Sequence, residues 1–265
     1  MISLETGKMN YGENFAPRTP GWEELGNIAC LCSNSDFVDV KENWQKHVND
    51  RAVDGDATEA GILKCYECLM GDTSKKRKMN PKVIDIPFNS RNKYQASVHR
   101  DAEGKHLLVM KGAPEIVFAK CETILVDGED VKIDETTRKR FREACERLAG
   151  MGQRVLAFVD LQLDSSKFPP GYNFSTDEEE PNFPLDKLRF VGLLSMIDPP
   201  KASVPDAVSK CRSAGIKVIM VTGDHPIMAQ AIAKEVGIIS SYLTPRLQSP
   251  TITNLEFLHL SQETS

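Results

Sequence analysis

The sequence contains no long apolar run and no excess of basic charge. A membrane-spanning helix needs about 20 consecutive apolar residues, and no such run occurs in this chain of 265 residues. The first residues, Met1 to Glu5, have neither the basic leader nor the apolar core of an export signal. The net charge is -5, whereas a nucleic-acid binder normally carries a basic excess on one face. We therefore expect a soluble chain that binds no nucleic acid, and we expect it to be monomeric in isolation.

Cysteine is present without the spacing of a disulfide framework. The seven cysteines are scattered, and no secretory signal precedes them, so reduced thiols in a cytosolic compartment are expected. Cys30 and Cys32 together with Cys65 and Cys68 could supply four thiolates to zinc. The first pair is poorly spaced, however, and the second falls within a helical pattern. We therefore predict buried small side chains and no metal site.

The common phosphate-binding loops are also missing. Gly7-Lys8 is followed by Met9 and lacks the upstream glycine of a Walker loop, and no G-x-G-x-x-G occurs. The short basic run from Lys75 to Lys78 is interpreted as a solvated loop, because charge runs usually lie in solvent.

The first part of the chain predicts helices followed by a meander of strands. A helix is expected from Pro20 to Cys32, and a second one from Asp56, where Glu59 completes the pattern of a capping box. From Val83 to Met110, apolar residues alternate with polar ones and turn residues interrupt them, which is typical of an antiparallel meander. Further elements are expected as a short helix from Pro114, a longer helix capped by Asp134 and a strand from Arg154 to Asp160.

After an irregular connector at 169–184, which contains the acidic run at 177–180, the pattern changes. Apolar runs at 190–197 and 216–221 predict buried strands, and helices are expected at 203–214 and 226–236. Strand and helix in alternation indicate a parallel doubly wound sheet. The prediction is an α/β chain with a nucleotide-binding domain at 1–188, a partial phosphorylation domain at 189–239 and a poorly ordered tail at 240–265.

Two regions offer candidate chemistry. Thr222, Gly223 and Asp224 follow a predicted strand, where parallel sheets collect ligands. Asp198 ends the neighbouring predicted strand. The alternative for each aspartate is a helix cap or a turn residue.

The meander offers the second region. Lys93 and Gln95 are predicted to share one face of a strand, and Lys93, Lys111 and Arg154 border strand ends that could converge on phosphates. Phe88 could stack on a purine. From pattern alone, the alternatives are core for Phe88, a capping box for Glu59 and solvated surface for each lysine.

Six segments occur in the order in which they are found in P-type cation-transporting ATPases. The sequence around them resembles that of the sodium/potassium and proton/potassium pumps of that family. The resemblance covers Gly21 to Ile239. The segments are Asp56-Ala57-Thr58-Glu59, Pro87-Phe88-Asn89-Ser90, Asn92-Lys93-Tyr94-Gln95, Met110-Lys111-Gly112-Ala113-Pro114-Glu115, Met196-Ile197-Asp198-Pro199-Pro200 and Val221-Thr222-Gly223-Asp224-His225-Pro226.

The resemblance implies a twisted antiparallel sheet flanked by helices, inserted into a phosphorylation domain of the haloacid-dehalogenase type. It implies ATP with Mg²⁺ as the ligand, and a parent pump in the plasma membrane with a beta subunit and with this region on its cytoplasmic side. The implied roles in the nucleotide pocket are adenine stacking for Phe88, contact with the polar edge of adenine or with nearby water for Glu59 and Gln95, and the pocket lining for Lys93, Lys111 and Gly112. Arg154 is implied to meet the phosphates. In the other domain, the implied roles are the catalytic crevice for Thr222, Gly223 and Asp224 and a hinge for Asp198.

The sequence also departs from the family pattern. The family's phosphoryl-acceptor segment Asp-Lys-Thr-Gly-Thr and its Asp-Gly-Val-Asn-Asp segment do not occur in these residues. Val159 stands where relatives usually carry Cys in the adenine pocket. We therefore expect ATP binding without pumping, from a pump whose transported cation the sequence does not reveal. The alternatives are a non-catalytic interaction protein derived from the pump domain, and a free-standing hydrolase or kinase that uses Asp198 or Asp224.

Overall fold

The computed structural model describes residues 21–176, 181–197, 200–222 and 226–239. The chain divides into two compact units, one formed by residues 1–141 and 155–194 and the other by residues 142–154 and 195–265. In chain order the elements are α1 (Trp22–Leu31), β1 (Asp36–Phe37), α2 (Lys41–Trp44), η2 (Val48–Asp50), β2 (Val53–Asp54), α3 (Ala57–Leu69), α4 (Thr73–Met79), β3 (Lys82–Ile86), β4 (Tyr94–Arg100), β5 (His106–Gly112), α5 (Pro114–Phe118), β6 (Cys121–Val126), β7 (Glu129–Lys132), α6 (Glu135–Gly150), β8 (Arg154–Gln162), β9 (Leu188–Met196), α7 (Val204–Ser213) and α8 (Pro226–Glu235).

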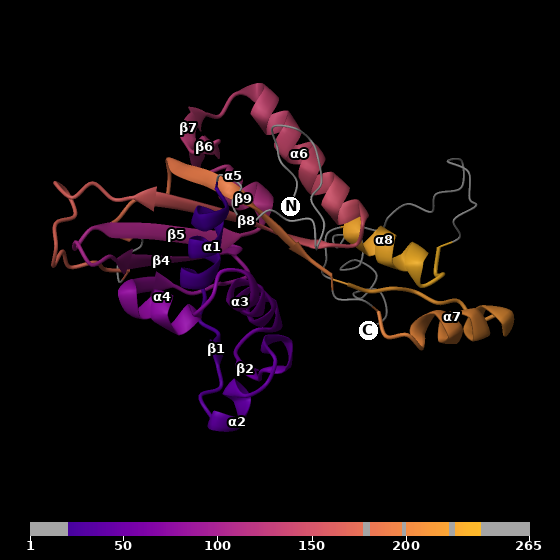
Figure 1. Ribbon diagram of the computed structural model, residues 1–265. Helices are drawn as coiled ribbons and strands as arrows, with labels where there is room; N and C mark the ends of the chain where they lie inside the picture. The colour runs from indigo at the N-terminus through magenta and orange to yellow at the C-terminus, as the bar shows by residue number, and fades with distance from the viewer. Residues whose placement is uncertain (1–20, 177–180, 198–199, 223–225, 240–265) are drawn as a thin grey trace, which may run out of the picture. The chain divides into compact units, whose positions relative to one another are not determined.

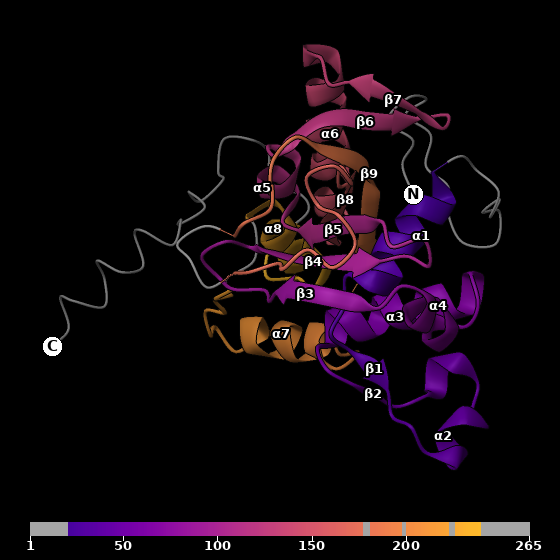
Figure 2. The same ribbon diagram turned by 90° about the vertical axis from the view of Figure 1, so that its left-hand side faces the viewer.

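A seven-stranded sheet in the order β3-β4-β5-β8-β9-β6-β7 forms the framework, and the order can be followed in Figure 2. Strands β3, β4 and β5 form the antiparallel meander that the alternating pattern predicted. Strand β8 pairs antiparallel with β5, a pairing that was not predicted. Strand β6 pairs with β7 in an antiparallel manner and with β9 in a parallel manner, so the sheet is mixed. The β6–β7 hairpin was not predicted.

Three helices cover one face of this sheet. Helix α1 contacts α3, α4 and β5, and Figure 1 shows these helices together beside the strands. The side chains of Leu25 and Ile28 on α1 and of Leu63 on α3 are almost completely buried, because each helix turns an apolar stripe toward the core. Each fully buried side chain of this size contributes roughly 1.5–3 kcal/mol. The core of the unit therefore lies between α1, α3 and the sheet.

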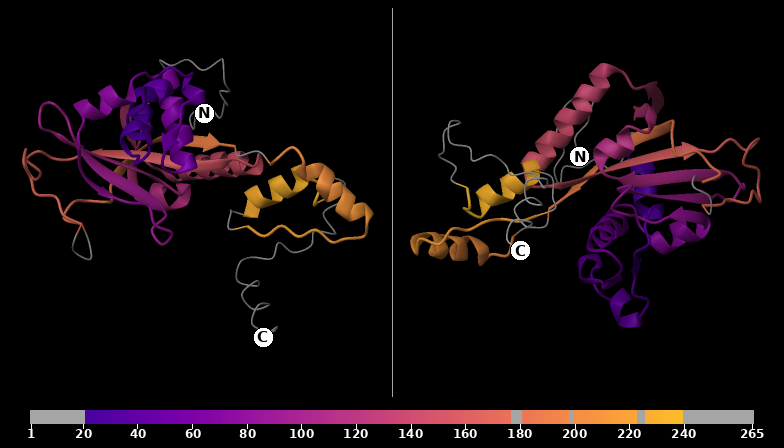
Figure 3. Two further views of the ribbon diagram at one scale, coloured as in Figure 1. Left: turned by 90° about the horizontal axis from the view of Figure 1, so that it is seen from below. Right: turned by 180° about the vertical axis from the view of Figure 1, so that it is seen from behind.

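The opposite face is covered by α5, which also contacts β5 and lies across the strands from α1 in Figure 3. Phe118 stacks on Phe141 with a centroid distance of 3.8 Å, and Phe190 meets both rings edge-on. Pro114 occupies the first turn of α5, where its missing N–H costs nothing.

The basic run interpreted as a loop is in fact a helix, α4. The Asp72 carboxylate caps it by accepting a hydrogen bond from the backbone N–H of Lys75 at 2.8 Å. Arg77 is anchored through hydrogen bonds to the carbonyls of Cys30 and Ser35. The loop prediction failed because a cap and a tertiary anchor stabilise helical backbone that the charge pattern alone does not reveal.

The second unit contains the two predicted helices, α7 and α8. The predicted strand at 216–221 is absent from the described residues, and Ile216, Ile219 and Val221 are 57–74% exposed. The α/β class is confirmed. Within the described residues, no helix is both long enough and apolar enough to cross a membrane. Asp198, Gly223, Asp224 and the tail at 240–265 lie outside the described residues.

Candidate functional site

Several of the predicted site residues meet at one end of the sheet. Phe88 follows the last residue of β3 by two positions, and Lys93 precedes the first residue of β4. In the register of β4 and β5, Gln95 faces Lys111 and Tyr94 faces Gly112. The carboxyl ends of β3 and β5 therefore lie beside the amino end of β4.

Lys93 lies in the turn before β4, and it is not part of the strand as predicted. Its φ of 57° is in the left-handed region, which costs a residue with a Cβ atom some strain. The turn is closed by a hydrogen bond from the Lys93 N–H to the Asn89 carbonyl at 2.8 Å. The Lys93 side chain is exposed, so its ammonium group is available to an anion.

Gly112 is required by the close approach of two backbones. A Cβ atom at Gly112 would lie 2.4 Å from the Lys93 carbonyl oxygen and 2.7 Å from the Tyr94 Cα. The N–H of the next residue, Ala113, donates to that same Lys93 carbonyl at 2.9 Å. Gly112 thus holds the turn of Lys93 against the end of β5.

A buried ion pair lies beneath this end of the sheet. The Lys111 ammonium contacts Glu59 Oε1 at 2.5 Å and also donates to the Cys32 carbonyl. The side chains of Lys111 and Glu59 are only 6% and 11% exposed. Both charges are therefore compensated inside the protein, as buried charges must be.

The second oxygen of Glu59 is also satisfied. Oε2 accepts hydrogen bonds from the backbone N–H of Asn34 at 3.0 Å, and from the N–H and hydroxyl of Ser35 at 3.0 and 3.1 Å. Burial by itself would raise the pKa of Glu59, but the Lys111 charge and these hydrogen bonds outweigh it and lower the pKa to about 2. Glu59 is therefore a permanent anion at neutral pH.

The interpretation of Glu59 as part of a capping box is wrong. Asp56 does cap α3, because its Oδ1 accepts from the N–H groups of Thr58 and Glu59 at 2.8 and 3.2 Å. The Glu59 carboxylate, in contrast, turns to Lys111 and Ser35. Asp56 therefore caps the helix, whereas Glu59 forms the buried ion pair with Lys111.

Sequence reasoning missed the loop after α1, which supplies the donors to Glu59. Arg77 binds the Ser35 carbonyl at 2.9 Å, and Lys82 donates to the Ser33 carbonyl at 3.4 Å and to Asn34 Oδ1 at 2.5 Å. The only local signal is the run Ser33-Asn34-Ser35, whose short polar side chains are typical of turns.

Phe88 is 61% exposed, so the assignment of Phe88 to the core is wrong. Gln95 is buried, and its backbone carbonyl accepts a weak hydrogen bond from the Cys32 thiol at 3.5 Å. Val159 is fully buried and pairs with Met110, while its neighbour Phe158 pairs with Lys111. Since side chains alternate along a strand, Val159 lies on the opposite face of the sheet from Lys111.

The remaining predicted residues belong to the second unit. Arg154 is the first residue of β8, and Thr222 is half-buried at the end of a described segment. Both residues fall in the second unit. The arrangement of Phe88, Lys93, Lys111 and Glu59 described above belongs to the first unit and does not include them.

The cluster at this end of the sheet combines an exposed aromatic ring, an exposed ammonium group and a buried polar floor. Such a surface suits a ligand with a flat apolar ring and negative charge. The charge of Lys111 is already neutralised by Glu59, so the negative charge of such a ligand would need exposed cations. Among the described residues, no group of three or more His, Cys, Asp or Glu could hold a metal ion.

Most of the chain is similar in sequence to known proteins. Residues 21–203 match the family model of the P-type ATPase cytoplasmic domain N, and residues 168–250 match a haloacid dehalogenase-like hydrolase. The chain is 54% identical over 238 residues to the sodium/potassium-transporting ATPase subunit alpha-2 of Homo sapiens and 52% identical to an alpha subunit of Tetronarce californica. It is 49% identical over 243 residues to the alpha subunit of Drosophila melanogaster. These alignments cover 89–91% of the chain but 23% of the length of each relative.

Proposed function

The chain belongs to the P-type ATPase family, and from that premise we propose that it is the ATP-binding cytoplasmic region of a sodium/potassium or proton/potassium pump alpha subunit. The observation that supports this proposal most strongly is the 61% exposure of Phe88, which lies in the same loop between β3 and β4 as the exposed Lys93. An exposed aromatic ring next to a cation is the minimum that a purine nucleotide needs from a protein whose net charge is negative.

In this proposal the adenine ring stacks on Phe88 and its polar edge meets Glu59 and Gln95. Lys93 faces the negative charge of the nucleotide, while Lys111 and Gly112 line the pocket. Arg154 contacts the phosphates. Both carboxylate oxygens of Glu59 already accept hydrogen bonds within the chain, Oε1 from Lys111 and Oε2 from Asn34 and Ser35. In this proposal the contact of Glu59 with the exocyclic amino group of adenine, which is a hydrogen-bond donor, therefore passes through a water molecule.

The parent pump transfers a phosphoryl group to an aspartate, and this step needs residues of the second unit. We propose that Thr222, Gly223 and Asp224 belong to that catalytic crevice, and that Mg²⁺ arrives with the nucleotide. The acceptor segment Asp-Lys-Thr-Gly-Thr does not occur in these 265 residues. A polypeptide of this sequence is therefore expected to bind ATP without forming the aspartyl-phosphate. The beta subunit and the plasma membrane are partners of the parent.

Calorimetry with Mg-ATP tests the proposal directly. We expect a dissociation constant between roughly tens of micromolar and a few millimolar, which corresponds to about -4 to -6 kcal/mol. No heat at millimolar ATP and low salt, from a chain whose circular dichroism shows it folded, would contradict ATP binding.

Replacing Phe88 by Ala is expected to weaken ATP binding about tenfold, because stacking on an aromatic ring contributes about 1–3 kcal/mol per base. The matched control is Trp44→Ala, which removes another exposed aromatic ring from α2, where Trp44 is 37% exposed. Isothermal titration of both variants should show a change for Phe88 alone. Equal affinity of Phe88→Ala and the unaltered chain would remove Phe88 from the site.

A further inference from the structure

Two cysteines on α3 share one exposed face of the helix. Cys65 and Cys68 are both exposed, whereas Cys30, Cys32 and Cys121 are buried. The residues between them point elsewhere, since Tyr66 is buried and Glu67 binds Arg51 and Thr73. A spacing of three residues places two side chains side by side on a helix, with Cβ atoms about 5–6 Å apart.

This separation selects the chemistry that the two thiols can undergo. A disulfide needs Cβ atoms about 3.5–4.5 Å apart, so α3 would have to distort to form one. A single thiophilic atom placed between the sulfurs forms one bond to each of them, and such a bond is about 2.3 Å long in the case of zinc and a thiolate. The two bonds together span the gap between the sulfurs without unwinding the helix. A bridged adduct therefore fits the helix better than a disulfide.

The surroundings limit which atom can form the bridge. No third metal-binding side chain joins the pair among the described residues, so a centre that needs four ligands is not satisfied. The Lys64 ammonium donates to the Asn49 carbonyl, and the Cys68 thiol donates to Asn49 Oδ1 at 3.8 Å. A cation would be repelled by Lys64, whereas a neutral centre with two sulfur ligands would not.

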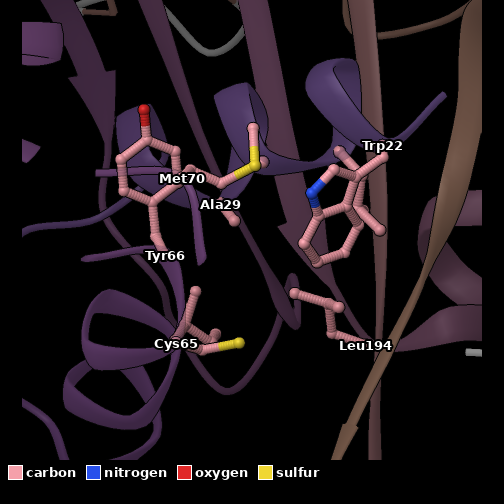
Figure 4. A pocket seen from close by; sticks show the side chains of 9 residues that line it. Trp22, Ala29, Cys65, Tyr66, Met70 and Leu194 are labelled. Carbon is pink, nitrogen blue, oxygen red and sulfur yellow. The ribbon is translucent and has the colours of Figure 1, made fainter. Parts of the chain in front are cut away.

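An apolar hollow of about 20 Å³ borders Cys65. Figure 4 shows the side chains of Trp22, Met70 and Leu194 around it, with the Cys65 sulfur on its rim. A space of this size holds about one water-sized group, which is also the size of a methyl group. Partial burial of the sulfur at this rim, together with the neighbouring Cys68, raises the pKa of Cys65.

We propose that Cys65 and Cys68 form a dithiol site for a trivalent organoarsenical, which bridges the two sulfurs and places a small apolar substituent in the hollow. With methylarsonous acid, two As–O bonds are replaced by two As–S bonds. The two thiol protons leave with the two hydroxyl groups as two molecules of water, and no atom changes oxidation state. The dithiol site uses none of the residues of the proposed ATP pocket. The proposal of a dithiol site can therefore be wrong while the proposal of ATP binding is right, and the reverse also holds.

The test is intact-mass spectrometry of the folded chain after incubation with methylarsonous acid and excess glutathione. We expect one methylarsenic group per chain to survive the monothiol, because the second As–S bond forms within one molecule. Cys65→Ser and Cys68→Ser should each lower this retention by about 100-fold. Cys145→Ser, which alters a half-buried cysteine of the second unit, should retain the adduct.

Retention in Cys65→Ser or Cys68→Ser equal to that of the unaltered chain would overturn the proposal, and so would loss of the adduct from the unaltered chain. Circular dichroism of each serine variant establishes that it is folded. The chain has two tryptophans, so a Trp44→Phe background isolates the emission of Trp22. That emission should change on binding, and an unchanged spectrum would exclude the hollow as the place of the methyl group.

Discussion

Glu59→Gln is expected to lower the free energy of unfolding by about 3 kcal/mol at pH 7, because removing one partner of a buried ion pair leaves the other charge uncompensated. Glutamine keeps the shape of the side chain, so the change isolates the charge. The Lys111 ammonium would remain buried at 6% exposure with an amide in place of its carboxylate. Urea unfolding followed by circular dichroism measures the difference.

The same pair predicts a pH dependence with a definite sign. The pKa of Glu59 falls from its ordinary value of 4.5 to about 2 in the folded chain. A carboxyl group with a depressed pKa stabilises the folded state fully above its unfolded value, and this stability is lost as the pH falls through the folded value. The advantage of the unaltered chain over Glu59→Gln should therefore persist above pH 4.5 and shrink steadily between 4.5 and about 2.

Glu103→Gln is the control for this prediction. Glu103 pairs with Lys105 on the surface, where the two side chains are 71% and 54% exposed, and such pairs contribute little. Its unfolding free energy should match that of the unaltered chain. If Glu59→Gln and Glu103→Gln gave the same stability at pH 7, the Glu59–Lys111 pair would not have the energetic role assigned to it.

The sequence predicted features whose cause is local. The cap of Asp56 on α3, the proline at the start of α5 and the alternating strands β4 and β5 each follow from residues within a few positions of one another. These signals depend on backbone geometry that neighbouring side chains fix. The prediction of a strand at 216–221 was wrong, although its apolar pattern was as clear as that of β4 and β5. A strand also needs a neighbouring strand to pair with its backbone hydrogen-bonding groups.

The resemblance proposed the residues of the candidate site, but it did not give their arrangement. Family resemblance named Glu59 and Lys111, yet these residues are 52 positions apart, and no local pattern shows that their charges cancel. The donors from Asn34 and Ser35 come from a third segment. For Phe88 the local pattern gave the wrong burial. An apolar residue after a strand is usually predicted to lie in the core, yet the Phe88 ring is 61% exposed.

Gly112→Ala is expected to disturb stability and ligand binding together. The added Cβ would lie 2.4 Å from the Lys93 carbonyl oxygen and 2.7 Å from the Tyr94 Cα, and both are backbone atoms that no side-chain rotation can move. Strands β4 and β5 must separate at this end, which costs about 2–3 kcal/mol by analogy with overpacked cores. The same displacement moves Lys93 and the turn that follows Phe88, so ATP affinity should fall at least about tenfold.

The control for Gly112 has the opposite expected sign. Gly61 lies in α3, and a Cβ there meets nothing within 4 Å. Alanine at that position should stabilise the helix by about 0.5–1 kcal/mol and leave ATP binding unchanged. Thermal unfolding and calorimetry on both variants distinguish two effects on stability and ATP binding: the general effect of replacing a glycine, and the clash of the added Cβ with the Lys93 turn at Gly112. If Gly112→Ala bound ATP as tightly as Gly61→Ala, the contact between β5 and the Lys93 turn would not position the nucleotide.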